Sequence, residues 1–552
     1  MRLPPRAAPA GPSLCAANLN VKEMWKSTDP LVQSHSSIDR LLSTGRFLSW
    51  ALAFGVAFTQ WPLYSENQHT KFLHGLATAG YGFLRQDWLA NTADPLPAFS
   101  FLVSASYRFL PEAFFYLYHV LLLGIYLYSV VGIACRIFQP LGTAVGRAVL
   151  SVAIIALHAT LLPPFSAKVL GVSLGWLLQS GVAGQYLINP AFQPSTFGVL
   201  LVLSIYMFLS GRSLWAAVAA ALAAVFHSTY LPSAAVLVAS YLAITLSEPA
   251  DTEHTRARRL RSALLSGAVA FALVLPVLAY SWVIMKPSSA EAWTRAQEII
   301  VHFRIPHHSL PEIWLDNTVF VKVAIVLLAV LLVRETRLFP ILLLSLLAAV
   351  VLTVLQMLWP NDTLAFVAPW RISAFLVPLS SCMAVASVLS AVIKRLELPG
   401  SKMNLVVAAL GTAALAALII RGAAAIQSSF DARRQSDRAP MLSYVRQAKA
   451  PGQTYIVPTD MAEFRLETGA PVLVTFKSHP YKDLEVIEWQ KRVLAANDFY
   501  AQPSCDKLHA LVAEYMTTHV VVESDQLAAG CSFLEELYRD SRYAVYSVRQ
   551  KP

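Results

Sequence analysis

Three carboxylates lie in a polar stretch, residues 65–100, that separates the first two apolar segments of the chain: Glu66, Asp87 and Asp94. A carboxylate can accept the proton of an attacking hydroxyl group, or it can hold a divalent cation. Helix capping is the alternative for both aspartates, and Asp94-Pro95 also favours a turn. Glu66 directly follows an apolar segment, so the sequence favours it as the catalytic carboxylate, with Asp87 second and Asp94 third.

Five further ionisable side chains fall within or at the ends of apolar segments. Such groups are costly in a bilayer and usually face the interior of a helix bundle or a watery cavity. A hydrogen bond between two helices explains any single one of them. Because all five map to the outer parts of their segments, we expect them to border a polar cavity on the outer side. They are His119, His158, His227, Lys322 and Arg371.

The composition identifies an integral membrane protein. Of the 552 residues, 56% are hydrophobic and only 14% are charged, whereas a soluble domain carries roughly 25% charged residues. The formal net charge of +10 resides in short loops between apolar segments, as the positive-inside rule predicts. We therefore expect no nucleic-acid partner.

The apolar segments predict a mainly α-helical bundle of about eleven membrane-spanning helices. Residues 1–45 form a cytoplasmic disordered tail and a short interfacial helix at 37–46, and residues 46–422 form the membrane domain, with a long first outer loop at 65–112. Residues 169–181 are short and rich in Gly, which predicts a re-entrant or interfacial helix. The predicted spans are 47–64, 113–136, 147–164, 196–210, 214–230, 232–247, 260–284, 318–333, 338–357, 371–393 and 403–421.

Basic residues set the predicted orientation. Arginine and lysine recur in five alternate loops, for example at Arg136, Arg212 and Arg337, which places these loops and the N-terminus in the cytoplasm. The first loop, the loop 285–317 and everything after Gly422 are then expected on the outer side.

Residues 436–552 predict a small extracytoplasmic α/β domain. Strands are predicted at 454–458, 471–476, 519–523 and 542–548, alternating with helices at 460–468, 483–498, 506–515 and 532–540. Such alternation is typical of a largely parallel sheet. Cys505 and Cys531 both fall in this domain, where a disulfide or two free thiols are equally compatible with the sequence. Within the domain, Lys477, His479 and Trp489 are the most visible binding candidates, although Trp489 is better explained as core.

The architecture resembles that of the GT-C-type glycosyltransferases, which use polyprenyl-phosphate sugars. The resemblance lies in the many spans, the acidic first outer loop and the outer C-terminal domain. Glu66-Asn67-Gln68, Gln86-Asp87-Trp88, Asp94-Pro95, Pro369-Trp370-Arg371 and residues 464–489 also resemble stretches of uncharacterised bacterial membrane proteins. The chain departs from the pattern in lacking the adjacent Asp-Glu pair of the mannosyltransferases and the WWD-type signature of the oligosaccharyltransferases.

The resemblance implies an inner-membrane enzyme that transfers a sugar from a lipid-phosphate donor to a glycan or lipid acceptor at the outer face. One acid of the first loop would act as base or metal ligand, and a divalent cation is a possible cofactor. Arg371 would pair with the phosphate of the donor, unless it only snorkels at a helix end. His227, His158, His119 and Lys322 would line the substrate cavity. Two alternatives remain open: a noncatalytic membrane protein whose C-terminal domain binds a glycan or protein partner, and a lipid or sugar transporter.

Overall fold

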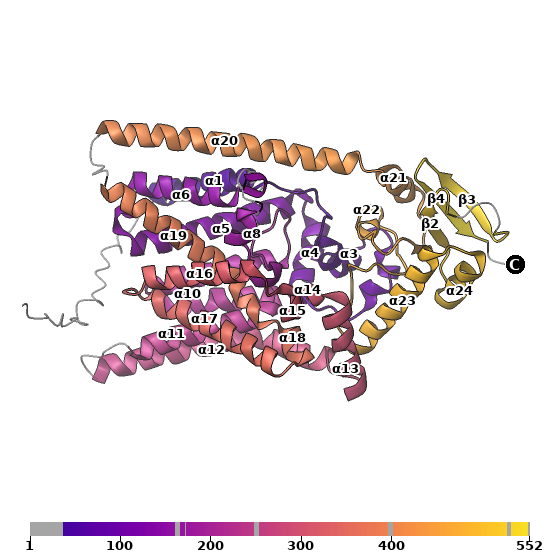
Figure 1. The fold of residues 1–552 in the computed structure, drawn as a ribbon, viewed down its shortest axis with the longest axis horizontal. Coiled ribbons are helices and arrows are strands. Elements are labelled where there is room, and N and C mark those ends of the chain that lie inside the picture. Colours follow the sequence, from indigo (N-terminus) through magenta and orange to yellow (C-terminus); the bar gives the residue numbers. More distant parts are fainter. Residues whose placement is uncertain are drawn as a thin grey trace, which may run out of the picture. The chain divides into compact units, whose positions relative to one another are not determined.

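The computed structural model describes residues 37–159, 166–169, 171, 173–247, 253–395, 401–526 and 531–549. The tail predicted to be disordered, residues 1–36, lies outside this part of the chain. The fold is mainly helical (Figure 1), and each predicted span coincides with a helix. These helices are α1 (Ser37–Phe58), α5 (Ala113–Ile137), α6 (Ala144–His158), α9 (Val199–Leu209), α10 (Ser213–Phe226), α11 (Leu231–Ser247), α12 (Glu253–Ile284), α16 (Asn317–Leu332), α17 (Leu338–Leu358), α19 (Ser373–Arg395) and α20 (Ser401–Arg434).

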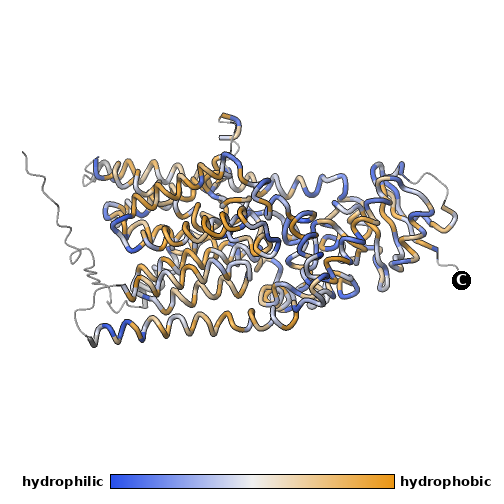
Figure 2. The backbone as a smooth tube through the Cα atoms, turned by 60° about the horizontal axis from the view of Figure 1, so that its bottom comes forward, coloured by the Kyte–Doolittle hydropathy of each residue, from blue (hydrophilic) through white to orange (hydrophobic). Residues whose placement is uncertain are grey.

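The helices have the length and composition of a polytopic membrane protein. Within the described ranges, six helical segments are long and apolar enough to cross a membrane, and four shorter apolar helices accompany them. Figure 2 shows the apolar colouring that runs along the helices of the bundle and the mixed colouring of the C-terminal region. Many large apolar side chains on α12, α17 and α20 are exposed, as expected for surfaces that face lipid.

Two helices differ from their predicted bounds. The interfacial helix predicted at 37–46 is continuous with the first span in α1, which ends at Phe58 and not at residue 64. The backbone turns there because Thr59 has a left-handed conformation, with φ of 80°, and the Trp61 amide donates to the Pro190 carbonyl at 2.9 Å. Helix α20 extends well past its predicted end, and at Gly422 it approaches α1 so closely that an added Cβ would lie 1.9 Å from the Val56 carbonyl oxygen.

The first loop is folded against the bundle. It contains α2 (Gln68–Lys71), α3 (Leu73–Ala79) and α4 (Pro97–Phe109). Phe72 is fully buried, and its ring lies 5.1 Å from that of Phe115 on α5 and 5.7 Å from that of Phe99 on α4. This aromatic packing fixes the polar residues that share the loop.

The C-terminal region carries the predicted small sheet domain, but its sheet is mixed. The strands are β1 (Tyr455–Ile456), β2 (His519–Glu523), β3 (Leu534–Arg539) and β4 (Tyr543–Val548), in the order β1-β2-β4-β3. Only β1 and β2 pair in parallel; β2–β4 and β3–β4 are antiparallel. Its helices are α21 (Ala439–Ala448), α22 (Phe464–Thr468), α23 (Asp483–Ala501) and α24 (Cys505–Tyr515).

Two secondary-structure predictions in this domain are wrong. Residues 532–540, predicted as a helix, contain β3, because Asp540 starts a tight turn: its Oδ1 accepts hydrogen bonds from the amides of Arg542 and Tyr543, both at 2.7 Å. Such a turn joins β3 and β4 into a hairpin, which is necessarily antiparallel. Residues 471–476, predicted as a strand, form only a bridge between Val472 and Tyr455.

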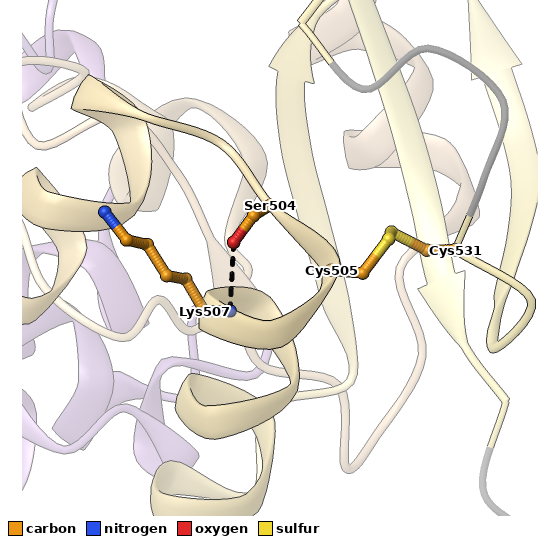
Figure 3. The surroundings of a disulfide bond; sticks show 4 residues. All are labelled: Ser504, Cys505, Lys507 and Cys531. Carbon is orange, nitrogen blue, oxygen red and sulfur yellow. Dashed lines mark hydrogen bonds between the residues drawn. A yellow bond between two sulfur atoms is a disulfide. The ribbon is translucent and has the colours of Figure 1, made fainter.

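Cys505 and Cys531 form a disulfide (Figure 3), which decides between the two alternatives left open by the sequence. Cys505 begins α24, and the preceding Ser504 caps that helix by accepting a hydrogen bond from the Lys507 amide at 3.3 Å. The bond closes a loop with a sequence separation of 26 residues. A disulfide that closes a loop of this length stabilises a domain by about 3 kcal/mol, because it lowers the conformational entropy of the unfolded chain.

Candidate functional site

Three cationic side chains from distant parts of the chain act electrostatically on the phenol of Tyr481, and one of them also donates a hydrogen bond to it. Lys71, the last residue of α2, donates to the Tyr481 hydroxyl at 3.0 Å. Arg304 ends the π-helical turn η7 (Ile299–Arg304), and Arg371 lies in the 3-10 turn η8 (Pro369–Ile372) just before α19. Both guanidinium groups interact electrostatically with Tyr481, which precedes α23. We refer to Lys71, Arg304, Arg371 and Tyr481 as the cationic cluster.

None of the three cations has a carboxylate partner within 4.0 Å among the described residues. Arg304 is held by neutral acceptors, with its Nε 3.1 Å from His479 Nδ1 and its Nη2 2.7 Å from the Lys477 carbonyl. The Nε of Arg371 is buried and has no hydrogen-bond partner in the part of the chain that the structure describes. Because charged groups withdrawn from water need a counter-charge, this arrangement favours the binding of an anion.

The ionisation of neighbouring groups reflects the excess of positive charge. Burial raises the pKa of Tyr481, but Lys71, Arg371 and Arg304 outweigh burial, so that its pKa is lowered below the ordinary value. The pKa of His479 is lowered well below its ordinary value by burial and then by the charges of Arg304 and Lys71. His479 is therefore neutral at neutral pH and its Nδ1 can accept the hydrogen bond from Arg304.

Asp94 lies beside the cationic cluster. Together with Lys71, His74 and His479 it lines a small cavity of about 10 Å³, which is room for about one water molecule. Its Oδ1 accepts a hydrogen bond from the Leu96 amide at 2.9 Å and lies 4.0 Å from His74 Nδ1. The side chain is 19% exposed, so it is positioned by its neighbours and still reachable.

Glu66, the first choice from the sequence, is more peripheral. Its side chain is 56% exposed and forms an ion pair with Lys477. Lys477 links Glu66 to the cationic cluster, because the Lys477 backbone carbonyl accepts a hydrogen bond from Arg304.

Asp87 is fully buried, and its oxygens are occupied by protein donors. Oδ2 accepts from Arg465 Nε at 2.7 Å and from the Val472 amide at 2.9 Å. Oδ1 accepts from the amides of Leu89 and Ala90 at 2.9 and 3.4 Å. This geometry favours a structural role for Asp87 over the expected catalytic one, because its carboxylate has no exposed surface and joins the first loop to the C-terminal domain.

The five ionisable groups expected to border one polar cavity do not lie together in the structure. Arg371 belongs to the cationic cluster, and His227 interacts electrostatically with Lys71 and Arg371. His119 bonds Gln60 at 2.6 Å, and His158 bonds the Ile154 carbonyl at 2.9 Å. Both are hydrogen bonds inside the bundle. Lys322 donates to Ser180 Oγ at 3.0 Å and to the Gly181 carbonyl at 2.9 Å.

Comparisons with known proteins give a partial family match. A family model described as "Domain of unknown function (DUF6798)" matches residues 436–496, a range that includes Arg465, His479 and Tyr481. No curated protein matches the chain. The crystal structure of ArnT from Cupriavidus metallidurans in the apo state is similar with 12% identity and a TM-score of 0.42, over 92% of this chain and 98% of that chain.

Lys71, Arg304 and Tyr481 are not among the residues predicted from the sequence. Arg304 lies in the stretch 302–308, where His308 Nδ1 lies 2.7 Å from the Ala183 carbonyl oxygen and Arg304 itself is half-buried. Only Lys477 and His479 pointed to this region from the C-terminal domain. Across the described ranges, no group of three or more His, Cys, Asp or Glu side chains is arranged to hold a metal ion.

Proposed function

We propose that this protein is an integral membrane glycosyltransferase that takes a sugar from a lipid-phosphate-linked donor at the outer face of the membrane. The observation that carries the proposal is the cationic cluster: three cations, partly accessible, without a carboxylate partner among the described residues. A guanidinium group holds a phosphate through two parallel hydrogen bonds, and a lysine adds a point charge. Tyr481 supplies a further hydrogen bond from its hydroxyl group.

The cluster suits the departure of a phosphate. In the transfer, the bond between the anomeric carbon and the phosphate oxygen breaks, and its electron pair remains on the phosphate. The acceptor oxygen bonds to the anomeric carbon and loses its proton. Fixed cations stabilise the charge that develops on the leaving group, and they do so strongly where water is partly excluded.

Asp94 is the carboxylate that we propose as the proton acceptor. It lines the same small cavity as Lys71, which places its carboxylate next to one cation of the cluster, and we propose that the acceptor hydroxyl group meets it there. Glu66 remains the rival, because it lies one ion pair away through Lys477.

The proposed location is the bacterial inner membrane, with a cytoplasmic N-terminus and an extracytoplasmic C-terminal domain. The basic loops support this orientation. The Cys505–Cys531 disulfide also supports it, because disulfides persist in oxidising compartments outside the cytoplasm.

Replacement of Arg371 by Lys separates phosphate binding from snorkelling. A snorkelling residue tolerates lysine, whereas a bidentate phosphate contact does not. We expect Arg371→Lys to lower kcat/KM for the lipid-linked donor by about tenfold or more, since a hydrogen bond to a charged group contributes about 1.5–3 kcal/mol. The measurement is sugar transfer in proteoliposomes over a range of donor concentrations.

Arg85→Lys is the control, because Arg85 is an exposed arginine of the first loop whose side chain, among the described residues, donates to the Ala77 and Thr78 carbonyls. It should behave as the unaltered protein. Equal kcat/KM values for Arg371→Lys and the unaltered protein would remove Arg371 from the phosphate site.

A further inference from the structure

A second cavity, of about 930 Å³, lies apart from the cationic cluster. Its walls come from the chain after α1, the start of α5, the end of α20, and helices α21 and α22. This volume is in the range of cavities that bind small molecules. None of Lys71, Arg304, Arg371 and Tyr481 lines it.

The lining combines an apolar and aromatic interior with a positively charged rim. The aromatic rings are those of Tyr64, Tyr81, Tyr116 and Phe430. Tyr64 and Tyr81 lie 5.6 Å apart between ring centroids. Aromatic side chains with a polar tip are typical of the interface between membrane and water.

The charged groups of the cavity leave a positive excess. Two arginines share one carboxylate: Arg433 lies 2.8 Å and Arg446 lies 3.5 Å from Glu467. The other lining carboxylate, Glu112, accepts a hydrogen bond from the Tyr64 hydroxyl. Arg434 is 75% exposed and its nearest carboxylate is Asp431, at 3.9 Å.

The position of the cavity matches the depth of lipid headgroups. Glu112 immediately precedes α5, whose apolar sequence begins at Ala113. On α20, Ser429 Oγ donates to the Gln60 carbonyl at 3.4 Å, level with the end of α1. The region just beyond the hydrocarbon core is where phospholipid headgroups lie.

We propose that this cavity binds an anionic glycerophospholipid, with the phosphate at Arg434 and Arg446 and the upper acyl chains against the aromatic interior. The apolar interior favours a lipid over a soluble anion, because a free phosphate has no surface to place there. The rim favours an anionic over a zwitterionic headgroup, since basic residues near a membrane attract anionic lipid. The proposal does not depend on the transferase reaction.

The test is native mass spectrometry of the full-length protein, taken from nanodiscs that contain equal amounts of phosphatidylglycerol and phosphatidylcholine. We expect the unaltered protein to retain phosphatidylglycerol preferentially. Arg434→Gln combined with Arg446→Gln should lower this retention by about tenfold or more, because each basic residue contributes roughly 1 kcal/mol to the attraction. Ser443→Trp places an indole ring in the cavity from an exposed position on α21. This variant should lower the retention of phosphatidylglycerol without a change in the charge of the protein.

Arg542→Gln combined with Arg549→Gln is the matched control, because both arginines are exposed on the C-terminal sheet and neither lines the cavity. This variant should retain the lipid as the unaltered protein does. Equal retention of both lipids, full retention by Ser443→Trp, or displacement of the lipid by free inorganic phosphate would each overturn the proposal.

Discussion

Replacement of Asp94 by Asn is expected to lower the turnover of the proposed sugar transfer by at least about 10², while the amount of folded protein in the membrane stays unchanged. General-base assistance typically contributes about 10²–10⁴ in rate, and asparagine keeps the size of the side chain but cannot accept the proton. The hydrogen bond from the Leu96 amide to Oδ1 can persist to the amide oxygen, so the loop should hold its shape. The measurement is sugar transfer under single-turnover conditions.

Glu66→Gln is the informative comparison. Its exposed ion pair with Lys477 contributes only about 0–1 kcal/mol, so its loss should leave turnover within a few-fold. A fully active Asp94→Asn protein beside an inactive Glu66→Gln protein would restore the ranking that the sequence suggested. If both variants complement a deletion strain fully, the acids are structural and a noncatalytic protein becomes the better account.

Asp87→Asn is expected to cause the largest loss of stability. This variant leaves Arg465 charged and buried, with 1% of its side chain exposed, but without its partner carboxylate. Breaking a buried ion pair from one side costs about 3–5 kcal/mol, and the amide NH₂ group would also face a second donor, either the Leu89 amide or the Val472 amide. We expect a lower midpoint of thermal unfolding and proteolysis between the first loop and the C-terminal domain.

Removal of both charges should be less harmful than removal of one. Asp87→Asn combined with Arg465→Met eliminates the unpaired cation and should recover part of the lost stability. A stable Asp87→Asn protein with lowered turnover would contradict the structural role and return Asp87 to the catalytic candidates.

The membrane helices could be predicted from the sequence because long apolar runs report burial in lipid directly. The eleven spans 47–64 to 403–421 each coincide with a helix, and the errors lie at ends, such as that of α1, where one left-handed residue, Thr59, stops the helix. The strand β3 was mistaken for a helix because residues 532–540 carry both charged and apolar residues at spacings that suit either structure. The Asp540 turn decides between them.

The candidate site was only partly accessible to sequence reasoning. Arg371 and Asp94 could be predicted as site residues from local sequence, because one is an arginine at the end of an apolar segment and the other is an acid in a polar loop. Lys71 and Tyr481 were missed, since 410 positions separate the partners of their hydrogen bond. No local pattern reports a contact of that kind. The role of Asp87 could not be predicted from the sequence, because a buried acid and a reactive acid look alike until a partner such as Arg465 is known.

The rest of the proposed function depends on phosphate binding by Lys71, Arg304 and Arg371 beside Tyr481. A cryo-electron microscopy structure of the full-length protein in a nanodisc with a polyprenyl phosphate tests this binding. We expect density for the phosphate within hydrogen-bond distance of Arg304 and Arg371. Phosphate density only at Arg434, or an empty cluster at saturating lipid, would contradict it.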